Sequence, residues 1–380
     1  MANILFLADG TWNGPGQADA PVRTTNVFKL YSLLAGDDDP ESLALAKEQE
    51  RRLVENGSLV QIAKYLHGVG DSSNDLVRML GGAFGAGVIA RIVRGYTFIS
   101  RHWMPGDRIF IVGFSRGAYT ARSLAGLIAA KGLLPTEDCA DKEQAYRIGA
   151  AVWAAYREQR DEPDDRRSVL AEVLSHLPSF LDPASQRAAR PSGPLRPASV
   201  ACLAVWDTVG ALGIPVYREG GDERMDVFRF CDCKLSEKVD KGYHAVAWEE
   251  QRVDFTPTLW EPRDGITQML FAGAHADVGG GYPLAGGESD LSHIGLRWMH
   301  EQLVAEGVRF KVDPAVAFPG SAFGPSHQPW TEFPWTLAPS ELRVSALFMS
   351  LPKHPSLMAR IARGGVYAVL PSGAQEPPRQ

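Results

Sequence analysis

The sequence has few cysteines, and their spacing fits neither a metal site nor a disulfide framework. Only four of its 380 residues are cysteine, and the pair Cys231 and Cys233 is separated by one residue. Structural zinc sites use cysteine pairs separated by roughly two to four residues, and no second pair follows here. We therefore expect no zinc site and no disulfides, a pattern typical of a reducing compartment.

The sequence also lacks an excess of positive charge and any long apolar run. Its 39 basic and 45 acidic residues give a formal net charge of −6, so we expect no nucleic-acid partner. No stretch reaches the roughly 18 uninterrupted apolar residues of a membrane-spanning helix. The start, MANILFLADG, lacks the basic residues of a signal peptide. We expect a cytoplasmic protein, or one exported by a route that needs no signal peptide.

Apolar runs alternate with helical patterns along the chain. Strands are predicted at residues 3–8, 59–66, 108–112, 198–206 and 266–274. Helices are predicted around residues 27–34, 41–55, 76–103, 118–130, 138–180, 242–248 and 291–306. This alternation is typical of an α/β fold, in which helices cover both faces of a mainly parallel sheet.

We expect these elements to form one domain over residues 1–370. Helical insertions interrupt it, chiefly at 132–198, where a helical pattern is followed by a proline-rich linker. The region 300–370 is predicted to be helical and aromatic. Within it, the aromatic stretch 318–335 either forms an apolar lid or groove or packs on the core. A disordered tail is predicted at 371–380.

The segment Gly113-Phe114-Ser115-Arg116-Gly117 lies between a β-branched strand and the start of a helix. In that context, the pattern G-x-S-x-G is typical of a nucleophile elbow, a sharp turn that presents a serine hydroxyl at the edge of a sheet. The glycines leave room where side chains would collide, and the helix N-terminus directs N–H groups at developing negative charge. The pattern predicts Ser115 as a nucleophile.

A serine nucleophile needs a histidine base, and the base needs an acid to orient it. Asp207 and His275 both follow predicted strands, in the chain order serine, acid, histidine that is typical of α/β-hydrolases. Because the carboxyl ends of parallel strands converge on one crevice, we predict a triad of these three residues. His244 is the second candidate for the base, and His67, which precedes the serine, is the third.

An oxyanion hole would complete such a site. One donor is expected to be the backbone N–H of Arg116, directly after the serine. The other is expected from the loop that follows the first strand, where the N–H of Gly10 or Thr11 lies beside Asp9. A β-turn capped by Asp9 is the alternative interpretation of this loop.

The same strand ends admit two other hypotheses. Asp9, Asp207, His275 and Asp277 have side chains that a divalent ion accepts as ligands, so the chain would then be a metal-dependent hydrolase with Ser115 outside the coordination sphere. The third hypothesis is a non-enzymatic interaction protein on a hydrolase fold, although such a protein has no need to retain serine, acid and histidine together. We favour the serine hydrolase, which needs neither metal nor cofactor.

Five motifs occur in order over about residues 3–300. They are LFLADGTWN (5–13), VGFSRGAYTAR (112–122), VWDTVGALG (205–213), YHAVAWEEQRVDFTP (243–257) and FAGAHADVGGGY (271–282). Together they resemble the α/β-hydrolase-like catalytic domain of type VI secretion phospholipase effectors and their bacterial and fungal relatives.

The resemblance implies a serine esterase or lipase that acts, in the effectors, on the acyl esters of phospholipids. It places the triad at Ser115, Asp207 and His275 and the family's DGT segment at 9–11. The effectors are long and carry additional membrane-targeting segments, whereas this sequence has no basic amphipathic stretch with a clear apolar face. The expected partners are an ester or lipid substrate and, transiently, a membrane surface.

Overall fold

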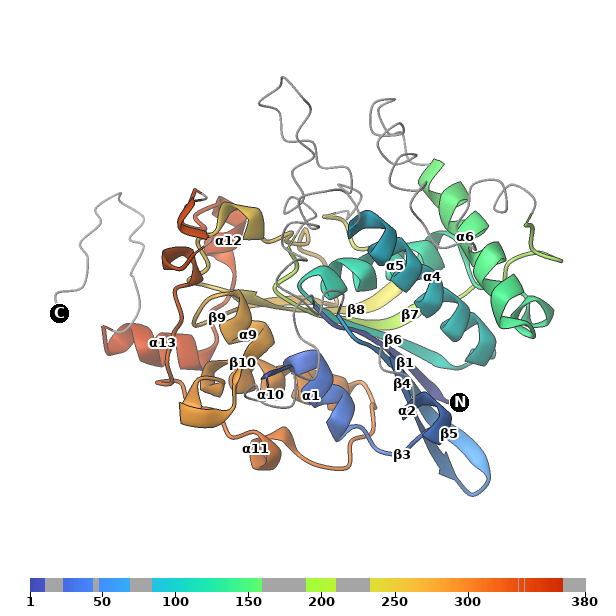
Figure 1. Ribbon diagram of the computed structural model, residues 1–380, viewed down its shortest axis with the longest axis horizontal. Coiled ribbons are helices and arrows are strands. Elements are labelled where there is room, and N and C mark those ends of the chain that lie inside the picture. The colour runs from blue at the N-terminus through green and yellow to red at the C-terminus, as the bar shows by residue number, and fades with distance from the viewer. Residues whose placement is uncertain are drawn as a thin grey trace.

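Strands and helices alternate along the part of the chain that the computed structural model describes (Figure 1). The described residues are 1–10, 23–43, 48–68, 84–158, 189–209, 233–333, 335–337 and 339–364. The strands are β1 (Asn3–Ala8), β2 (Arg23–Thr25), β3 (Asp37–Asp38), β4 (Glu48–Glu55), β5 (Ser58–Leu66), β6 (Arg108–Phe114), β7 (Val200–Trp206), β8 (Val239–Ala247), β9 (Ile266–Phe271) and β10 (Gly280–Pro283). The α-helices are α1 (Asn26–Leu33), α2 (Pro40–Leu43), α4 (Phe84–His102), α5 (Arg116–Lys131), α6 (Lys142–Glu158), α9 (His275–Gly279), α10 (Asp290–Ala305), α11 (Pro314–Ala317), α12 (Ala346–Ser350) and α13 (Pro355–Ala362).

The central sheet has the strand order β3-β4-β5-β1-β6-β7-β8-β9. The six strands from β5 to β9 in this order are parallel, whereas β4 pairs antiparallel with both β5 and β3. Strands β2 and β10 form a separate antiparallel pair. The predicted α/β fold with a mainly parallel sheet is confirmed. Parallel strands end at the same edge, so the residues after β1, β6, β7, β8 and β9 all lie along one side of the sheet.

Helices cover both faces of this sheet (Figure 1). Ile4 and Phe6 of β1 share one apolar core with α4, α5 and α6. Leu5 and Leu7 point to the other face, where they pack with α1 and α10. Because a strand buried on both faces needs apolar residues at every position, this packing explains the continuous apolar run of β1. None of the helices in the described residues is long and apolar enough to cross a membrane.

Two segments predicted as helices are largely strands. In the charged segment 41–55, residues 41–43 belong to the short helix α2, whereas residues 48–55 form β4. The side chains of β4 pair across the sheet: Arg51 binds Asp38, and Lys64 of β5 binds Glu48 and Glu50. The segment 242–248 lies almost entirely in β8, a central strand between β7 and β9.

Other predictions differ at their ends or lie outside the described residues. The strand predicted at 266–274 ends at Phe271, and His275 is the first residue of α9. The long helix predicted at 76–103 is described from Phe84 onward, as α4. Thr11 and the predicted tail at 371–380 lie outside the described residues.

Candidate active site

Ser115 occupies the turn between β6 and α5. Its φ of 56° and ψ of −123° form a conformation that residues other than glycine rarely adopt. Such strained residues cluster at functional sites. A side-chain carbon at Gly117 would lie 2.0 Å from the Ala8 carbonyl oxygen, and one at Gly113 would lie 2.4 Å from the Gly117 carbonyl oxygen. The two glycines therefore allow the start of α5 to pack directly against β1 and β6.

Asp207 and His275 form a short hydrogen bond at the same edge of the sheet. The Nδ1 atom of His275 lies 2.7 Å from Oδ2 of Asp207. Asp207 follows β7 and is fully buried, and its Oδ1 accepts a hydrogen bond from the Ala247 amide at 2.9 Å. When Nδ1 donates to a carboxylate, the neutral imidazole presents Nε2 as its acceptor. This is the tautomer that a general base requires.

Two contacts place Ser115 next to this pair, one made by its own backbone and one by the ring of Phe114 before it. Its amide donates to the carbonyl of Trp206, the residue before Asp207, at 3.2 Å. The ring of Phe114 lies 4.6 Å from the ring of His275, measured between centroids. The structure thus brings the three predicted triad residues to one edge of the sheet.

The charges at this edge favour a neutral histidine beside an ionised acid. Burial raises the pKa of Asp207, but the charge of Arg343 and the bond to His275 outweigh it and hold that pKa well below its usual range. Burial lowers the pKa of His275, and this effect outweighs the raising effect of Asp207. At neutral pH the pair is therefore a carboxylate and an uncharged imidazole.

The two expected oxyanion donors differ in what the structure shows. Arg116 is the first residue of α5, so its amide lies at the N-terminus of that helix, directly after the serine. A side-chain carbon at Gly10 would lie 3.3 Å from Cβ of Ser115, so the loop after β1 does lie beside the serine. However, the Gly10 amide donates to Oδ1 of Asp9 at 2.6 Å. This hydrogen bond argues against the predicted donor role of Gly10, and Thr11 lies outside the described residues.

Comparisons with known proteins identify a family. The family model described as T6SS, phospholipase effector Tle1-like, catalytic domain matches residues 2–302. The chain belongs to this Tle1-like family. It is 33% identical over 145 residues to an uncharacterized protein of Saccharomyces cerevisiae, a match that covers 35% of this chain and 18% of the yeast protein.

Two solved structures are similar to this Tle1-like chain. An uncharacterized protein from Pseudomonas aeruginosa aligns with a TM-score of 0.42 and 17% identity, over 82% of this chain and 46% of its own. The Tle1 effector bound to the VgrG spike of the type VI secretion system aligns with a TM-score of 0.40 and 16% identity, over 75% of this chain and 52% of its own. The chain thus spans about half the length of these two proteins.

Arg343 is a site residue that the sequence analysis missed. Its guanidinium binds both oxygens of Asp207, with Nη1 2.7 Å from Oδ1 and Nη2 3.0 Å from Oδ2. It also donates to the carbonyl oxygens of Ala247 and Phe255. Arg343 lies outside the span of the Tle1-like family match and belongs to no motif, so no local pattern identified it.

Asp9 is a structural residue at the base of the predicted loop. Its carboxylate accepts hydrogen bonds from the Gly10 amide, the Thr25 hydroxyl and the Tyr65 hydroxyl, at 2.6, 2.7 and 2.5 Å. Burial raises the pKa of Asp9 to about 6, against the lowering effect of these donors. The arrangement supports the alternative interpretation of a capped turn, because the carboxylate is directed at its own neighbours.

Asp277 is directed away from the triad. Its Oδ1 lies 2.6 Å from Nδ1 of His327, and its Oδ2 accepts the amides of Ala274 and His327, both at 2.9 Å. Asp207 is already paired with the guanidinium of Arg343. The four side chains that the metal-dependent hypothesis required therefore do not form one ligand set. Among the described residues, no group of three or more His, Cys, Asp or Glu side chains is arranged to hold an ion.

The two alternative histidines pack in the interior. Nε2 of His244 accepts the Thr208 amide at 3.1 Å, and burial lowers the pKa of His244 to about 3, so this side chain stays neutral. The ring of His67 lies 4.8 Å from that of Tyr65. Both contacts indicate structural roles.

The aromatic stretch 318–335 divides between the two expected roles. Trp335 packs edge-on against Phe255, with ring centroids 5.3 Å apart, and Phe255 lies 4.9 Å from His275. Phe318 packs instead against the core that contains α1 and α10. One end of the stretch therefore packs against Phe255, the neighbour of His275, and the other end stabilises the core.

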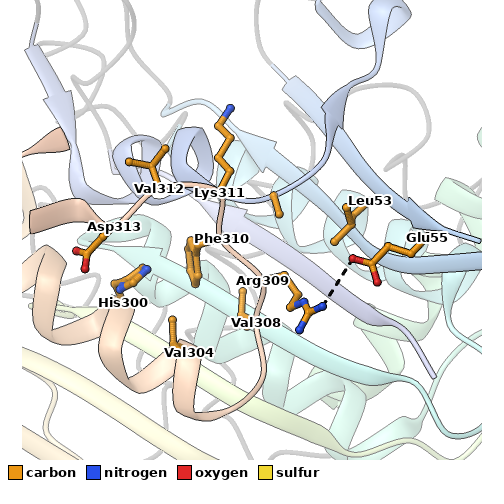
Figure 2. Close-up of a pocket in the computed structure, with 11 residues that line it drawn as sticks. Leu53, Glu55, His300, Val304, Val308, Arg309, Phe310, Lys311, Val312 and Asp313 are labelled. Carbon is orange, nitrogen blue, oxygen red and sulfur yellow. Dashed lines mark ion pairs between the residues drawn. The ribbon is translucent and has the colours of Figure 1, made fainter. Parts of the chain in front are cut away.

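A groove of about 560 Å³ lies elsewhere, at the opposite edge of the sheet. Figure 2 shows its lining by the end of β4 and by residues 300–313, with an ion pair between Glu55 and Arg309. It adjoins the start of β1, because the Asn3 side chain donates to the Gly307 carbonyl. The groove is therefore separate from the triad.

Proposed function

We propose that this chain is a serine hydrolase that cleaves carboxylic esters, with lipid acyl esters as its substrate class. The observation that carries the proposal is the position of Ser115, in a strained turn beside the hydrogen-bonded pair of Asp207 and His275. Membership of a phospholipase effector family supports a lipid ester over other esters. The ring of Phe255, which packs against His275, and that of Trp335, which packs against Phe255, provide an apolar surface that suits an acyl chain.

In the proposed reaction, Oγ of Ser115 attacks the ester carbonyl carbon while Nε2 of His275 accepts the hydroxyl proton. Asp207 stabilises the resulting imidazolium through Nδ1. The backbone N–H of Arg116 stabilises the tetrahedral oxyanion, and we assign the second donor to the loop at Thr11. His275 returns the proton to the leaving alcohol, which gives an acyl-serine. Water, deprotonated by the same imidazole, then releases the acid and restores Ser115.

A fluorophosphonate probe tests the nucleophile directly. The purified protein is labelled with and without chelator, and the site is mapped by mass spectrometry. We expect labelling of Ser115 in both conditions, none in Ser115→Ala, and unchanged labelling in Ser350→Ala, which removes an exposed hydroxyl on α12. A panel of esters and phospholipids then defines the substrate.

Each alternative hypothesis has its own outcome in this experiment. Loss of hydrolysis in chelator that a divalent ion restores would favour the metal-dependent enzyme. Absence of both labelling and hydrolysis across the panel would favour the interaction protein. Full esterase activity in Ser115→Ala would exclude the proposed mechanism.

A further inference from the structure

Each of the two carboxylates that bind His275 is paired with its own arginine. Arg343 binds Asp207, which accepts from the imidazole, and Arg252 binds Glu250, which accepts the His275 amide at 3.1 Å. The Arg252 contacts are 2.9 and 2.8 Å, so both arginines bind their carboxylate through two nitrogens. This two-point geometry fixes the plane of a carboxylate as well as its charge.

Arg343 leaves the Asp207 carboxylate only one orientation. Its two terminal nitrogens contact one oxygen each, the Ala247 amide adds a second donor to Oδ1, and Oδ2 is left to face His275. The guanidinium is itself held by the carbonyls of Ala247 and Phe255. Rotation of the carboxylate would break several of these bonds together.

We infer that Arg343 is a positioning residue of the triad, which aims Oδ2 of Asp207 at His275 and offsets the negative charge of that carboxylate. The inference rests on the proposed serine-hydrolase function. A carboxylate without a cation stabilises the imidazolium and so holds a proton on the base up to a higher pH. With Arg343 in place, His275 remains neutral, and able to accept the proton of Ser115, down to a lower pH.

The other charged groups around His275 do not cancel the effect of Arg343 on its protonation. The pair of Glu250 and Arg252 carries no net charge. His244 is neutral because burial, together with the charge of Arg122, lowers its pKa to about 3. Removal of Arg343 therefore leaves the acid of the triad as the nearest uncompensated charge beside the imidazole.

The pH dependence of kcat/KM tests the inference. The variants are Arg343→Met, Arg343→Lys and, as a matched control, Arg309→Met, which removes an exposed arginine at the groove of Figure 2. The probe is a short-chain p-nitrophenyl ester. In Arg343→Met we expect the acid limb, where protonation of His275 abolishes activity, to move up by about one pH unit. We expect kcat to fall while KM changes little, because the Arg343 side chain is 5% exposed and is paired with the acid of the triad.

The two other variants separate charge from geometry. Arg343→Lys keeps the charge but cannot span both oxygens, so we expect a lower rate with the acid limb near its original position. Arg309→Met should match the parent protein in both respects. If Arg343→Met only lowers the rate and leaves the acid limb unmoved, the arginine has a purely structural role and the inference fails.

A measurement without turnover makes the test independent of the proposed activity. The His275 imidazole is titrated by NMR in Ser115→Ala and in Ser115→Ala combined with Arg343→Met. A higher midpoint in the second protein supports the inference, and equal midpoints overturn it, whether or not the chain hydrolyses esters. Should Arg343→Met fail to fold, Arg343→Gln retains hydrogen-bond donors without the charge. It should then show the shift that Arg343→Lys lacks.

Discussion

Two arginine–carboxylate pairs lie at opposite edges of the same sheet, and they differ mainly in burial. Arg343 and Asp207 approach to 2.7 Å with side chains 5% and 0% exposed, whereas Arg309 and Glu55 are 3.6 Å apart with side chains 58% and 48% exposed. Water screens the exposed pair, whose contribution to stability is expected to be about 0–1 kcal/mol. The buried pair is shielded from water, so its charges act on their neighbour, His275. The buried pair therefore affects the chemistry because it is shielded from water and lies beside His275.

The largest effect on activity is expected when the carboxylate of the buried pair, Asp207, is replaced. In Asp207→Asn one of the two acceptor oxygens becomes an NH2 donor, and a donor facing Nδ1 selects the wrong tautomer of His275. We expect kcat to fall by about 10⁴-fold, the size of effect that such a substitution has in a serine triad. Glu55→Gln, the equivalent change in the exposed pair, should leave kcat unchanged. Steady-state ester hydrolysis measures both, and a loss below tenfold in Asp207→Asn would contradict the assignment.

The second prediction concerns stability and compares the loss of the arginine from each pair. Arg343→Met leaves a buried carboxylate without its cation, which typically costs about 3–5 kcal/mol in free energy of unfolding. Arg309→Met should change that free energy by less than about 1 kcal/mol. Urea unfolding followed by tryptophan fluorescence gives both values. Equal losses in the two variants would show that burial is not the deciding factor.

Two glycines differ in a similar way, because Gly117 is tightly packed and Gly193 has open space around it. Alanine at Gly117 would place its side-chain carbon 2.0 Å from a backbone oxygen, whereas Gly193 has no atom within 4 Å of that position. We expect Gly117→Ala to cost at least about 1–3 kcal/mol and to displace Ser115, with loss of activity. Gly193→Ala should stay within about 0.5 kcal/mol. Thermal unfolding and fluorophosphonate labelling of the two variants provide the check.

The smallest effect is expected at a pair of intermediate burial, Asp277 and His327. Burial lowers the pKa of His327, but the hydrogen bond and charge of Asp277 outweigh it and raise that pKa above its ordinary 6.5. A raised pKa means that the folded state binds the proton more tightly. This stabilisation is complete below pH 6.5 and is lost as the pH rises through the raised value. His327→Gln should therefore lower the urea midpoint at pH 6 more than at pH 8.5. A constant difference across that range would refute the pairing.

The parts of the site that follow from local sequence could be predicted. The apolar run of β1, the strand before Ser115 and the glycines around it are encoded within a few residues of one another. The positions of Asp207 and His275 followed from a general rule, since parallel strands end at one edge. The roles of these residues in a reaction stay predictions, which the labelling experiment addresses.

The errors arose where partners distant in sequence decide the structure. Charged residues at 41–55 suggested a helix, but those at 48–55 have partners on neighbouring strands such as β5. The short segment 242–248 has no period that distinguishes a helix from a buried strand. At Gly10 the cause is local instead: its amide was expected to face the substrate, but the carboxylate of the preceding residue, Asp9, accepts it.

The position of Arg343 beyond the matched span, 2–302, has a consequence for how relatives are compared. The motifs that identify the family contain the serine, the acid and the histidine, but not the residue that binds the acid. Two proteins with the same motifs would then differ in the acidity at which they work, according to what each places against its aspartate. Adaptation to an acidic or a neutral surrounding would require no change in the motifs themselves.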